Sequence, residues 1–200
     1  MPLKLLQIFA RAPVQGQVKT RLAAGIGEQQ ACEVYNRLLV NTVKNSRSEN
    51  WEVELWCAPD THHWVFKSLA EQYGLRLKTQ CGEGLGERML YALSEGGKVA
   101  DKVVLIGTDC PVISAGYVEQ AFEVISVKNI VFGPVEDGGY ILVGAGEVNQ
   151  DMFSDVGWSV ADTLAQNIAA IERCNLSYGL LPQLWDVDVT DDLKRWQQLP

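Results

Sequence analysis

Acidic side chains follow several predicted strands of this 200-residue chain, close to the points where the strands end. Asp109 comes two residues after the end of the apolar run 102–107, Asp137 lies in a glycine-rich turn, and Asp186 and Asp188 alternate in an acidic segment. Mg²⁺ in proteins takes one or two carboxylates together with phosphate oxygens of a substrate. An aspartate after a strand can also cap its own turn, so each acid has a structural alternative.

Cations follow the first predicted strand, within residues 9–22. Gly16 permits a close backbone approach, Lys19 supplies a point charge, and Arg21 supplies a planar fork that suits phosphate oxygens. The Walker spacing and the GxGxxG dinucleotide fingerprint are both absent. The alternative is a solvated basic loop before a helix. Cations at one strand end and acids at others suit a diphosphate held against a divalent metal, so we predict a nucleotide-handling enzyme.

The turn 133–140 (GPVEDGGY) supports two hypotheses. In the first, Asp137 serves as a general base or hydroxyl ligand, while Gly138 and Gly139 expose backbone N–H groups to an acceptor or sugar. In the second, the segment is an ordinary Asp-Gly hairpin turn. From the residues alone the hairpin turn is favoured.

The segment 186–193 (DVDVTDDL) also has a structural and a metal-binding interpretation. Thr190 is a good helix N-cap, and the two aspartates after it suit the first turn of a helix. That assignment leaves Asp188, and then Asp186, as candidate metal ligands.

The glycine-rich segment 81–89 (CGEGLGERM) leads into a predicted helix. Its backbone could pack on a base or ribose, and Arg88 could reach a phosphate. The alternative is a plain helix N-terminus whose acidic residues complement the helix dipole. Trp158, between a glycine and a predicted helix, is the tryptophan we expect nearest the cleft.

Strand and helix patterns alternate along the chain, which predicts an α/β sandwich with a mainly parallel sheet. Ligands of such sheets gather at the carboxyl ends of the strands, where the motifs above fall. Strands are predicted at 3–10, 51–58 (half-buried), 76–80, 102–107, 129–132, 140–143 and 176–180. Helices are predicted at 28–46, 62–73 and 85–94, after Ser114, and after a capping box formed by Ser159 and Asp162.

Composition narrows the class of protein. The chain is 47% hydrophobic with a formal net charge of −8, so it is predicted to be a single globular domain, residues 1–200, without the basic footprint of a nucleic-acid binder. The N-terminal apolar run is too short to span a membrane. Five cysteines without a CxxC pair argue against a zinc site or disulfide framework, and the cytoplasm is the expected location.

The ordered set of motifs resembles the bacterial GT-A-like family of glycosyltransferases that includes arsenosugar-biosynthesis-type proteins. That family is related to molybdenum cofactor and 2-phospho-L-lactate guanylyltransferases. The resemblance runs over essentially the whole chain and implies the three-layer, Rossmann-like nucleotide-diphospho-sugar transferase fold. The positions that carry it are Pro13, Gly16, 19–22, 84–89, 107–111, 133–140, Trp158 and 186–193.

The resemblance implies that Lys19 and Arg21 face the nucleotide phosphates and that Asp109 and Asp188 hold the metal. Together with the motifs above, it gives four sets of predicted site residues. The catalytic set is Asp109, Asp137 and Lys19. The metal set is Asp109 and Asp188, holding Mg²⁺ or Mn²⁺. The nucleotide set is Ala10, Pro13, Gly16, Lys19, Arg21, Gly84, Gly86 and Arg88. The acceptor set is Gly138, Gly139, Tyr140 and Trp158.

The leading hypothesis for the reaction is transfer of a sugar from a nucleotide diphospho-sugar to a small acceptor. The rival is nucleotidyl transfer with release of pyrophosphate, and a third possibility is a nucleotide-binding domain without catalysis. The DxD pair of sugar-transferring relatives is absent at 107–111, where Asp109 is the single acid. The residues leave the base, the sugar, the acceptor and the oligomeric state open.

Overall fold

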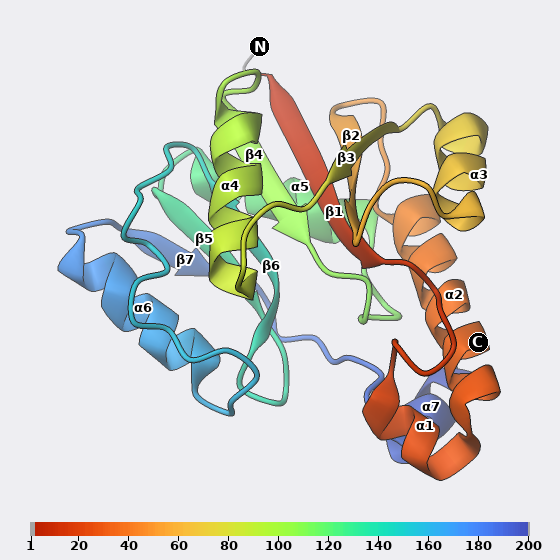
Figure 1. Ribbon diagram of the computed structural model, residues 1–200. Coiled ribbons are helices and arrows are strands. Elements are labelled where there is room, and N and C mark those ends of the chain that lie inside the picture. The colour runs from red at the N-terminus through yellow and green to blue at the C-terminus, as the bar shows by residue number, and fades with distance from the viewer. Residues whose placement is uncertain (1–2, 200) are drawn as a thin grey trace.

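The chain folds into three layers, a central sheet between two layers of helices (Figure 1). The computed structural model describes residues 3–199, and within them seven strands pair in the order β3-β2-β1-β4-β6-β5-β7. The strands are β1 (Lys4–Arg11), β2 (Glu52–Ala58), β3 (Arg76–Thr79), β4 (Lys102–Ile106), β5 (Ile130–Pro134), β6 (Tyr140–Ala145) and β7 (Tyr178–Leu180). The helices are α1 (Thr20–Ile26), α2 (Glu28–Asn45), α3 (Trp64–Tyr73), α4 (Leu85–Gly97), α5 (Ala115–Ile125), α6 (Thr163–Arg173) and α7 (Thr190–Gln197).

Strand β6 runs against the rest of the sheet. It pairs antiparallel with β4 and β5, whereas the other pairings between the described strands are parallel. The predicted Rossmann-like, mainly parallel sheet and the predicted hairpin before Tyr140 are therefore confirmed. Because β6 is reversed, its first residues lie at the edge where the parallel strands end. There the Gly107 N–H donates to the Ile141 carbonyl at 2.9 Å.

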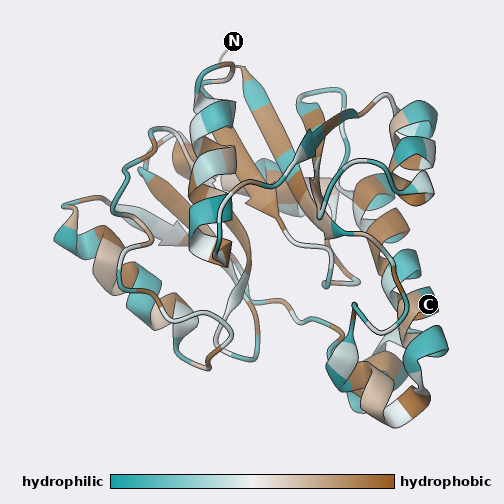
Figure 2. Cartoon of the chain, in the orientation of Figure 1, coloured by the Kyte–Doolittle hydropathy of each residue, from teal (hydrophilic) through white to brown (hydrophobic). Residues whose placement is uncertain are grey.

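Apolar side chains cover both faces of the sheet, and the strands are the most hydrophobic part of the chain in Figure 2. Helices α2, α3 and α5 pack on one face, around residues such as Ile8 and Val104. Helices α4 and α6 pack on the other face, around Leu105 and Phe132. Within residues 3–199, every helix is too short or too polar to cross a membrane.

The prediction that β2 is half-buried is wrong. Glu54 and Trp56 point to the face opposite Val53 and are 5% and 1% exposed. Glu54 can be buried because its carboxylate accepts from the Trp56 indole at 3.0 Å and pairs with Arg76 at 3.4 Å. A satisfied acid can therefore occupy a covered strand face, which the alternation of residue types does not reveal.

Three predicted helix starts also need correction, whereas the Ser114 cap is confirmed by its hydrogen bond from Tyr117 N–H. Helix α3 begins at Trp64 rather than residue 62, because the His63 ring accepts the Val65 N–H and caps the helix. Helix α6 begins at Thr163, and the proposed Ser159 capping box does not form, since Ser159 has φ 62° and lies outside the helix. Thr190 is the first residue of α7 rather than its cap.

The segment between β7 and α7 runs along the edge where the parallel strands end (Figure 1). Its backbone is fixed there by three N–H donors. Leu181 donates to Phe132 O at 2.9 Å, Leu184 to Pro134 O at 2.9 Å, and Val187 to Asp109 O at 3.0 Å. This path carries Asp186 and Asp188 to the loop that holds Asp109.

Candidate active site

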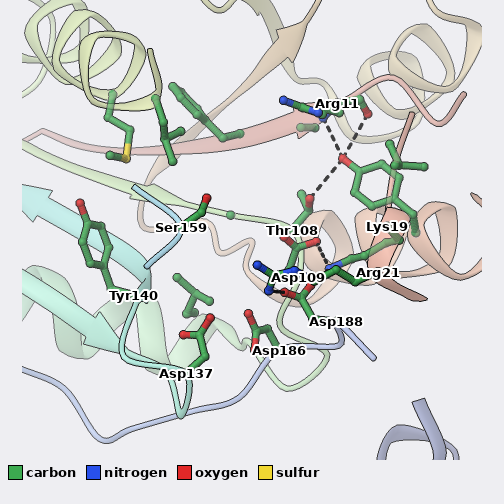
Figure 3. A pocket seen from close by; sticks show the side chains of 18 of the residues that line it. Arg11, Lys19, Arg21, Thr108, Asp109, Asp137, Tyr140, Ser159, Asp186 and Asp188 are labelled. Carbon is green, nitrogen blue, oxygen red and sulfur yellow. Dashed lines mark hydrogen bonds and ion pairs between the residues drawn. The ribbon is translucent and has the colours of Figure 1, made fainter. Parts of the chain in front are cut away.

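A cleft of about 760 Å³ opens at this edge of the sheet (Figure 3). Its walls come from the ends of β1 and β4, the start of β6, the loop before α1, and the segments 159–161 and 186–188. Of the residues predicted to act here, those that line it are Ala10, Lys19, Arg21, Asp109, Asp137, Tyr140, Asp186 and Asp188. Segments more than 150 residues apart in sequence therefore meet in one concave site, the usual form of a small-molecule site.

Lys19 lies between two carboxylates at one end of the cleft. Its Nζ is 2.6 Å from Asp109 Oδ1 and 2.8 Å from Asp188 Oδ1, and its side chain is 5% exposed. Burial alone would lower the pKa of the ammonium, but the two carboxylates outweigh it and raise that pKa. Arg21 lies at 3.6 Å from the other Asp188 oxygen and is largely exposed.

The backbone of Lys19 is in the left-handed region, with φ 49° and ψ 46°. A residue other than glycine rarely adopts this backbone conformation, which costs roughly 1–2 kcal/mol. It persists here because the ion pairs hold the side chain at one end while α1 begins at the next residue. Local strain of this kind is concentrated at functional sites.

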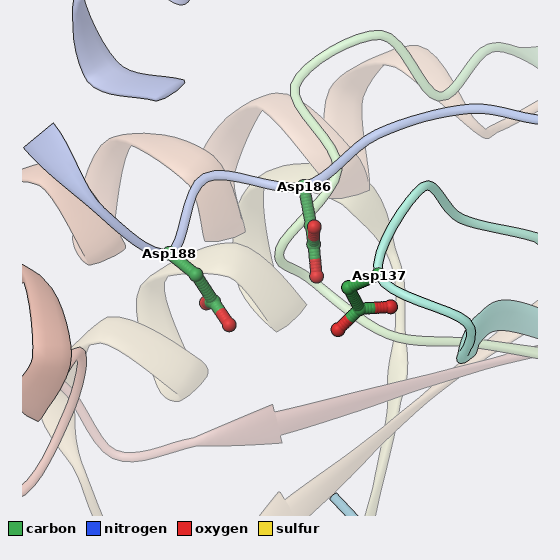
Figure 4. Close-up of side chains that lie close together, drawn as sticks. All are labelled: Asp137, Asp186 and Asp188. Carbon is green, nitrogen blue, oxygen red and sulfur yellow. The ribbon is translucent and has the colours of Figure 1, made fainter. Parts of the chain in front are cut away.

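Asp137, Asp186 and Asp188 form what we call the carboxylate cluster (Figure 4). One oxygen from each lies within 4.8 Å of the others. Burial, followed by the charges of Asp188 and Asp137, raises the pKa of Asp186 to about 6. Lys19 offsets only part of this effect, so the cluster carries excess negative charge.

The donor set of the cluster suits a hard divalent cation such as Mg²⁺ or Mn²⁺, which prefers carboxylate oxygens. Asp186, our second choice among the sequence candidates, belongs to this group, and so does Asp137, which we predicted as a base. Asp109, predicted as a metal ligand, is instead paired with Lys19 and is not part of the group. A metal at Asp109 and Asp188 stays a prediction.

A buried tyrosine beneath the cleft was missed by the sequence analysis. The Tyr35 hydroxyl, from α2, accepts the Arg11 N–H at 2.7 Å, donates to the Arg11 carbonyl and accepts from Thr108 Oγ1 at 3.3 Å. Burial raises its pKa to about 12, so it stays neutral. The network ties the ends of β1 and β4 together, and no spacing in the sequence signals it because α2 lies between them in the chain.

Several residues predicted to bind the nucleotide do not line the cleft: Pro13, Gly16, Gly84, Gly86 and Arg88. Gly16, at φ 76°, is approached by the side chain of Glu28. Arg88 is turned away, because its Nε donates to the Gly82 carbonyl at 2.9 Å. Their nucleotide contacts stay predictions that would need these side chains or loops to move.

The turn before β6 is the hairpin turn that the residues alone favoured. Gly138 N–H donates to Val135 O at 3.2 Å and Gly139 N–H donates to Asp137 Oδ1 at 2.9 Å. Both N–H groups are therefore engaged within the turn, and their contacts with an acceptor or sugar stay predictions. Gly138, at φ 88°, lies so close to Ala161 that an added Cβ would be 1.7 Å from its carbonyl oxygen.

The contact between Gly138 and Ala161 helps to hold the segment 159–161 at the cleft. Trp158, the residue before this segment, packs on helix α4. A Cβ on Gly86 would be 2.7 Å from the Trp158 ring, so the indole lies directly on the first turn of α4. Tyr140, the residue of the predicted acceptor set that lines the cleft, packs edge-on against Trp158 and donates to Asn167 at 2.7 Å. Trp158 itself does not line the cleft.

Comparison with solved structures identifies the class of fold. A protein of Desulfovibrio desulfuricans G20 described as a candidate nucleotide-diphospho-sugar transferase matches with a TM-score of 0.85 and 27% identity, over 94% of this chain and 84% of that one. The sequence in turn defines the family. Residues 42–160 match the family described as "Uncharacterized protein conserved in bacteria (DUF2064)", and the chain belongs to it. No curated protein matches the sequence.

More distant structural neighbours share the fold and divide between two types of transferase. A cytidylyltransferase of Leptospira borgpetersenii matches with a TM-score of 0.63 and 13% identity, over 96% of this chain and 84% of that one. Glucosyl-3-phosphoglycerate synthase of Mycobacterium tuberculosis, in complex with Mn²⁺ and UDP, matches with a TM-score of 0.55 and 11% identity, over 98% and 76%. Nucleotidyl and glycosyl transferases that act on nucleotide donors therefore both share this fold.

Proposed function

We propose that the protein is a metal-dependent transferase that uses a nucleotide-activated donor. The observation that carries this proposal is the position of Lys19 and Arg21 beside the carboxylate cluster in one cleft. Cations and a carboxylate-bound metal together can neutralise a diphosphate that neither could hold alone. The fold of the structural neighbours supports the same class of reaction.

Mg²⁺ or Mn²⁺ is the metal that the donor set fits, with Asp137, Asp186 and Asp188 as the residues that would hold it. When bound, such an ion supplies Lewis-acid stabilisation of charge on the phosphate oxygens. The Mn²⁺ of the glucosyl-3-phosphoglycerate synthase complex supports the choice of ion. Burial, followed by the charges of Asp188 and Asp137, raises the pKa of Asp186, and a partly buried carboxylate beside like charges gains from a bound cation.

The chain's own residues then have distinct tasks. Lys19 and Arg21 bind and orient the phosphates. Asp109 pairs with Lys19 and holds that ammonium at the edge of the cleft. Asp137 is better placed as a ligand than as the general base, because one oxygen accepts the Gly139 N–H and it also belongs to the carboxylate cluster. Tyr140 and the segment 159–161 form the wall that would face the acceptor.

Sugar transfer is the reaction we favour, because the 27%-identical Desulfovibrio protein is described as a candidate nucleotide-diphospho-sugar transferase. Nucleotidyl transfer is the second candidate. It is favoured by the three cations Arg11, Lys19 and Arg21, which line the cleft at the end of β1 and could stabilise a pyrophosphate leaving group. Membership of the arsenosugar-biosynthesis-type family, which the sequence resemblance implies, stays a prediction.

A thermal-shift screen tests the proposal. Nucleoside triphosphates, nucleoside diphosphates and nucleotide diphospho-sugars would each be added with and without Mn²⁺. A ligand that binds the folded state raises the melting temperature by mass action. We expect metal-dependent stabilisation by a diphospho-sugar. Selective stabilisation by a triphosphate would favour nucleotidyl transfer, and no shift with any nucleotide would overturn the proposal.

A further inference from the structure

Helix α7 contacts the neighbours of all three residues in the carboxylate cluster without lining the cleft itself. Arg195 pairs with Glu136, which precedes Asp137 in sequence. The same guanidinium lies 4.2 Å from the ring centre of Trp185, which precedes Asp186. Asp192 accepts the backbone N–H of Asp188 itself at 2.9 Å.

We propose that Arg195 and Asp192 are positioning residues that set the spacing of the carboxylate cluster for its cation. The inference rests on the proposed function as far as the cation is concerned. Neither side chain is among those that line the cleft, so each acts through the residue that it holds.

The contacts of Arg195 fix the guanidinium in two directions. In its plane, Nη1 and Nη2 donate to the two Glu136 oxygens at 2.8 and 3.1 Å. Its Cζ also lies over the Trp185 ring, 4.2 Å from the ring centre. A planar fork can make both contacts at once, whereas the ammonium of a lysine cannot. Arg195 thus joins the hairpin that carries Asp137 to the segment that carries Asp186.

Asp192 fixes the third ligand through the backbone. Its Oδ2 accepts the N–H groups of Asp188 and Val189, both at 2.9 Å. An aspartate at this position also complements the positive end of the helix dipole. The chain direction at Asp188 is therefore set by α7, while its carboxylate is free to face Lys19 and the cluster.

The attachment of α7 does not depend on these two side chains. Leu193 is buried in an apolar group with Leu22, Leu38, Trp185 and Val187. Replacement of Arg195 should therefore leave the helix in place and loosen only the spacing of the acids. Exposed ion pairs have modest effects, so we expect a change in cation affinity of roughly two- to fivefold.

Mn²⁺ affinity, measured by electron paramagnetic resonance of the free ion, separates positioning from simple charge. Arg195→Met removes a positive charge near a cation site, so electrostatics alone predicts tighter Mn²⁺ binding. Positioning predicts weaker binding. Lys194→Met is the matched control, since Lys194 lies on the same helix and, among residues 3–199, pairs only with the exposed Asp191. Its Mn²⁺ affinity should equal or slightly exceed that of the wild type.

Conservative variants complete the test. Asp192→Asn and Asp192→Ala both remove the charge, but only alanine removes the acceptor, so alanine should weaken Mn²⁺ binding more. Should Arg195→Met melt early, Arg195→Lys keeps the positive charge but cannot hold Glu136 and Trp185 together, so it should also weaken binding. Equal or tighter Mn²⁺ binding by Arg195→Met and Arg195→Lys would overturn the inference alone. A wild-type protein that binds no Mn²⁺ would overturn the proposed metal site and this inference together.

Discussion

Asp109 and Asp186 are two acids of the same cleft in opposite electrostatic situations. Asp109 lies 2.6 Å from the Lys19 ammonium, a cation that the chain provides. Asp186 faces Asp137 and Asp188, and its burial, followed by these two charges, raises its pKa to about 6. Asp188 belongs both to the carboxylate cluster and to the ion-paired group around Lys19, since one of its oxygens is 2.8 Å from the Lys19 ammonium.

Asp109 therefore acts as a counterion of Lys19, whereas Asp186 is the acid that needs a cation from outside the chain. Where the fold supplies a lysine, the acid is already satisfied and serves to hold that lysine. Where acids face one another without sufficient positive charge, the folded state is destabilised unless a cation binds. Substitutions at these positions can separate the two roles.

The largest effect is expected at Asp188, which the two groups share. Asp188→Asn should weaken Mn²⁺ binding and lower kcat/KM by roughly a hundredfold or more, because it removes a ligand and a partner of Lys19 together. Asp109→Asn should weaken Mn²⁺ binding far less, since Asp109 is not part of the cluster. The measurements are Mn²⁺ titration and turnover of the donor found by screening. Equal losses in the two variants would contradict the distinction between the groups.

Replacement of Lys19 should leave Asp109, like Asp186, without a cation that the chain provides. Lys19→Met should lower nucleotide affinity by roughly ten- to a hundredfold, because a charge-assisted contact to phosphate is worth roughly 1.5–3 kcal/mol. The same variant should bind Mn²⁺ more tightly, since Asp109 and Asp188 lose their counterion. Isothermal titration with nucleotide and with Mn²⁺ measures both. Lys98→Met, which removes an exposed ion pair with Glu95 on α4, is the control.

The smallest expected effect is a gain in stability. Asp186→Asn should raise the free energy of unfolding by roughly 1 kcal/mol in the absence of metal, because it removes a carboxylate whose charge the fold disfavours. The gain is smaller than the pKa shift implies because the side chain is partly exposed. Thermal melts at neutral pH measure it, with Asp109→Asn expected to melt lower through loss of its Lys19 pair. A lower melting temperature for Asp186→Asn would refute this account.

The fold could be predicted from sequence where one residue type dominates an element. Strand β4 is a continuous apolar run, and Ser114 caps α5 through its own hydroxyl, so both follow from local chemistry. The start of α6 could not be predicted, because the path of residues 159–161 depends on the close contact between Gly138 and Ala161. The full burial of β2 could not be predicted, because Glu54 pairs with Arg76, which lies on the neighbouring strand β3.

The site was predictable to the extent that strand ends identify it. The acids and cations after the strands do line one cleft, as the sheet topology requires. Their pairing could not be predicted, because the hydrogen bond from Val187 to Asp109 fixes the register between segments about 80 residues apart. The ammonium of Lys19 could equally have faced solvent, and only the folded backbone turns it inward.

The reversed direction of β6 has a consequence for how such a cleft can diversify. A parallel strand is joined to its neighbour by a crossover that contains a helix, so a change at its end must be accommodated by a whole layer. The turn that carries Asp137 instead joins two adjacent antiparallel strands and spans only a few residues between β5 and β6. This wall of the cleft can therefore be shortened, extended or exchanged as a separate part, while the phosphate side and the layers of helices stay unchanged.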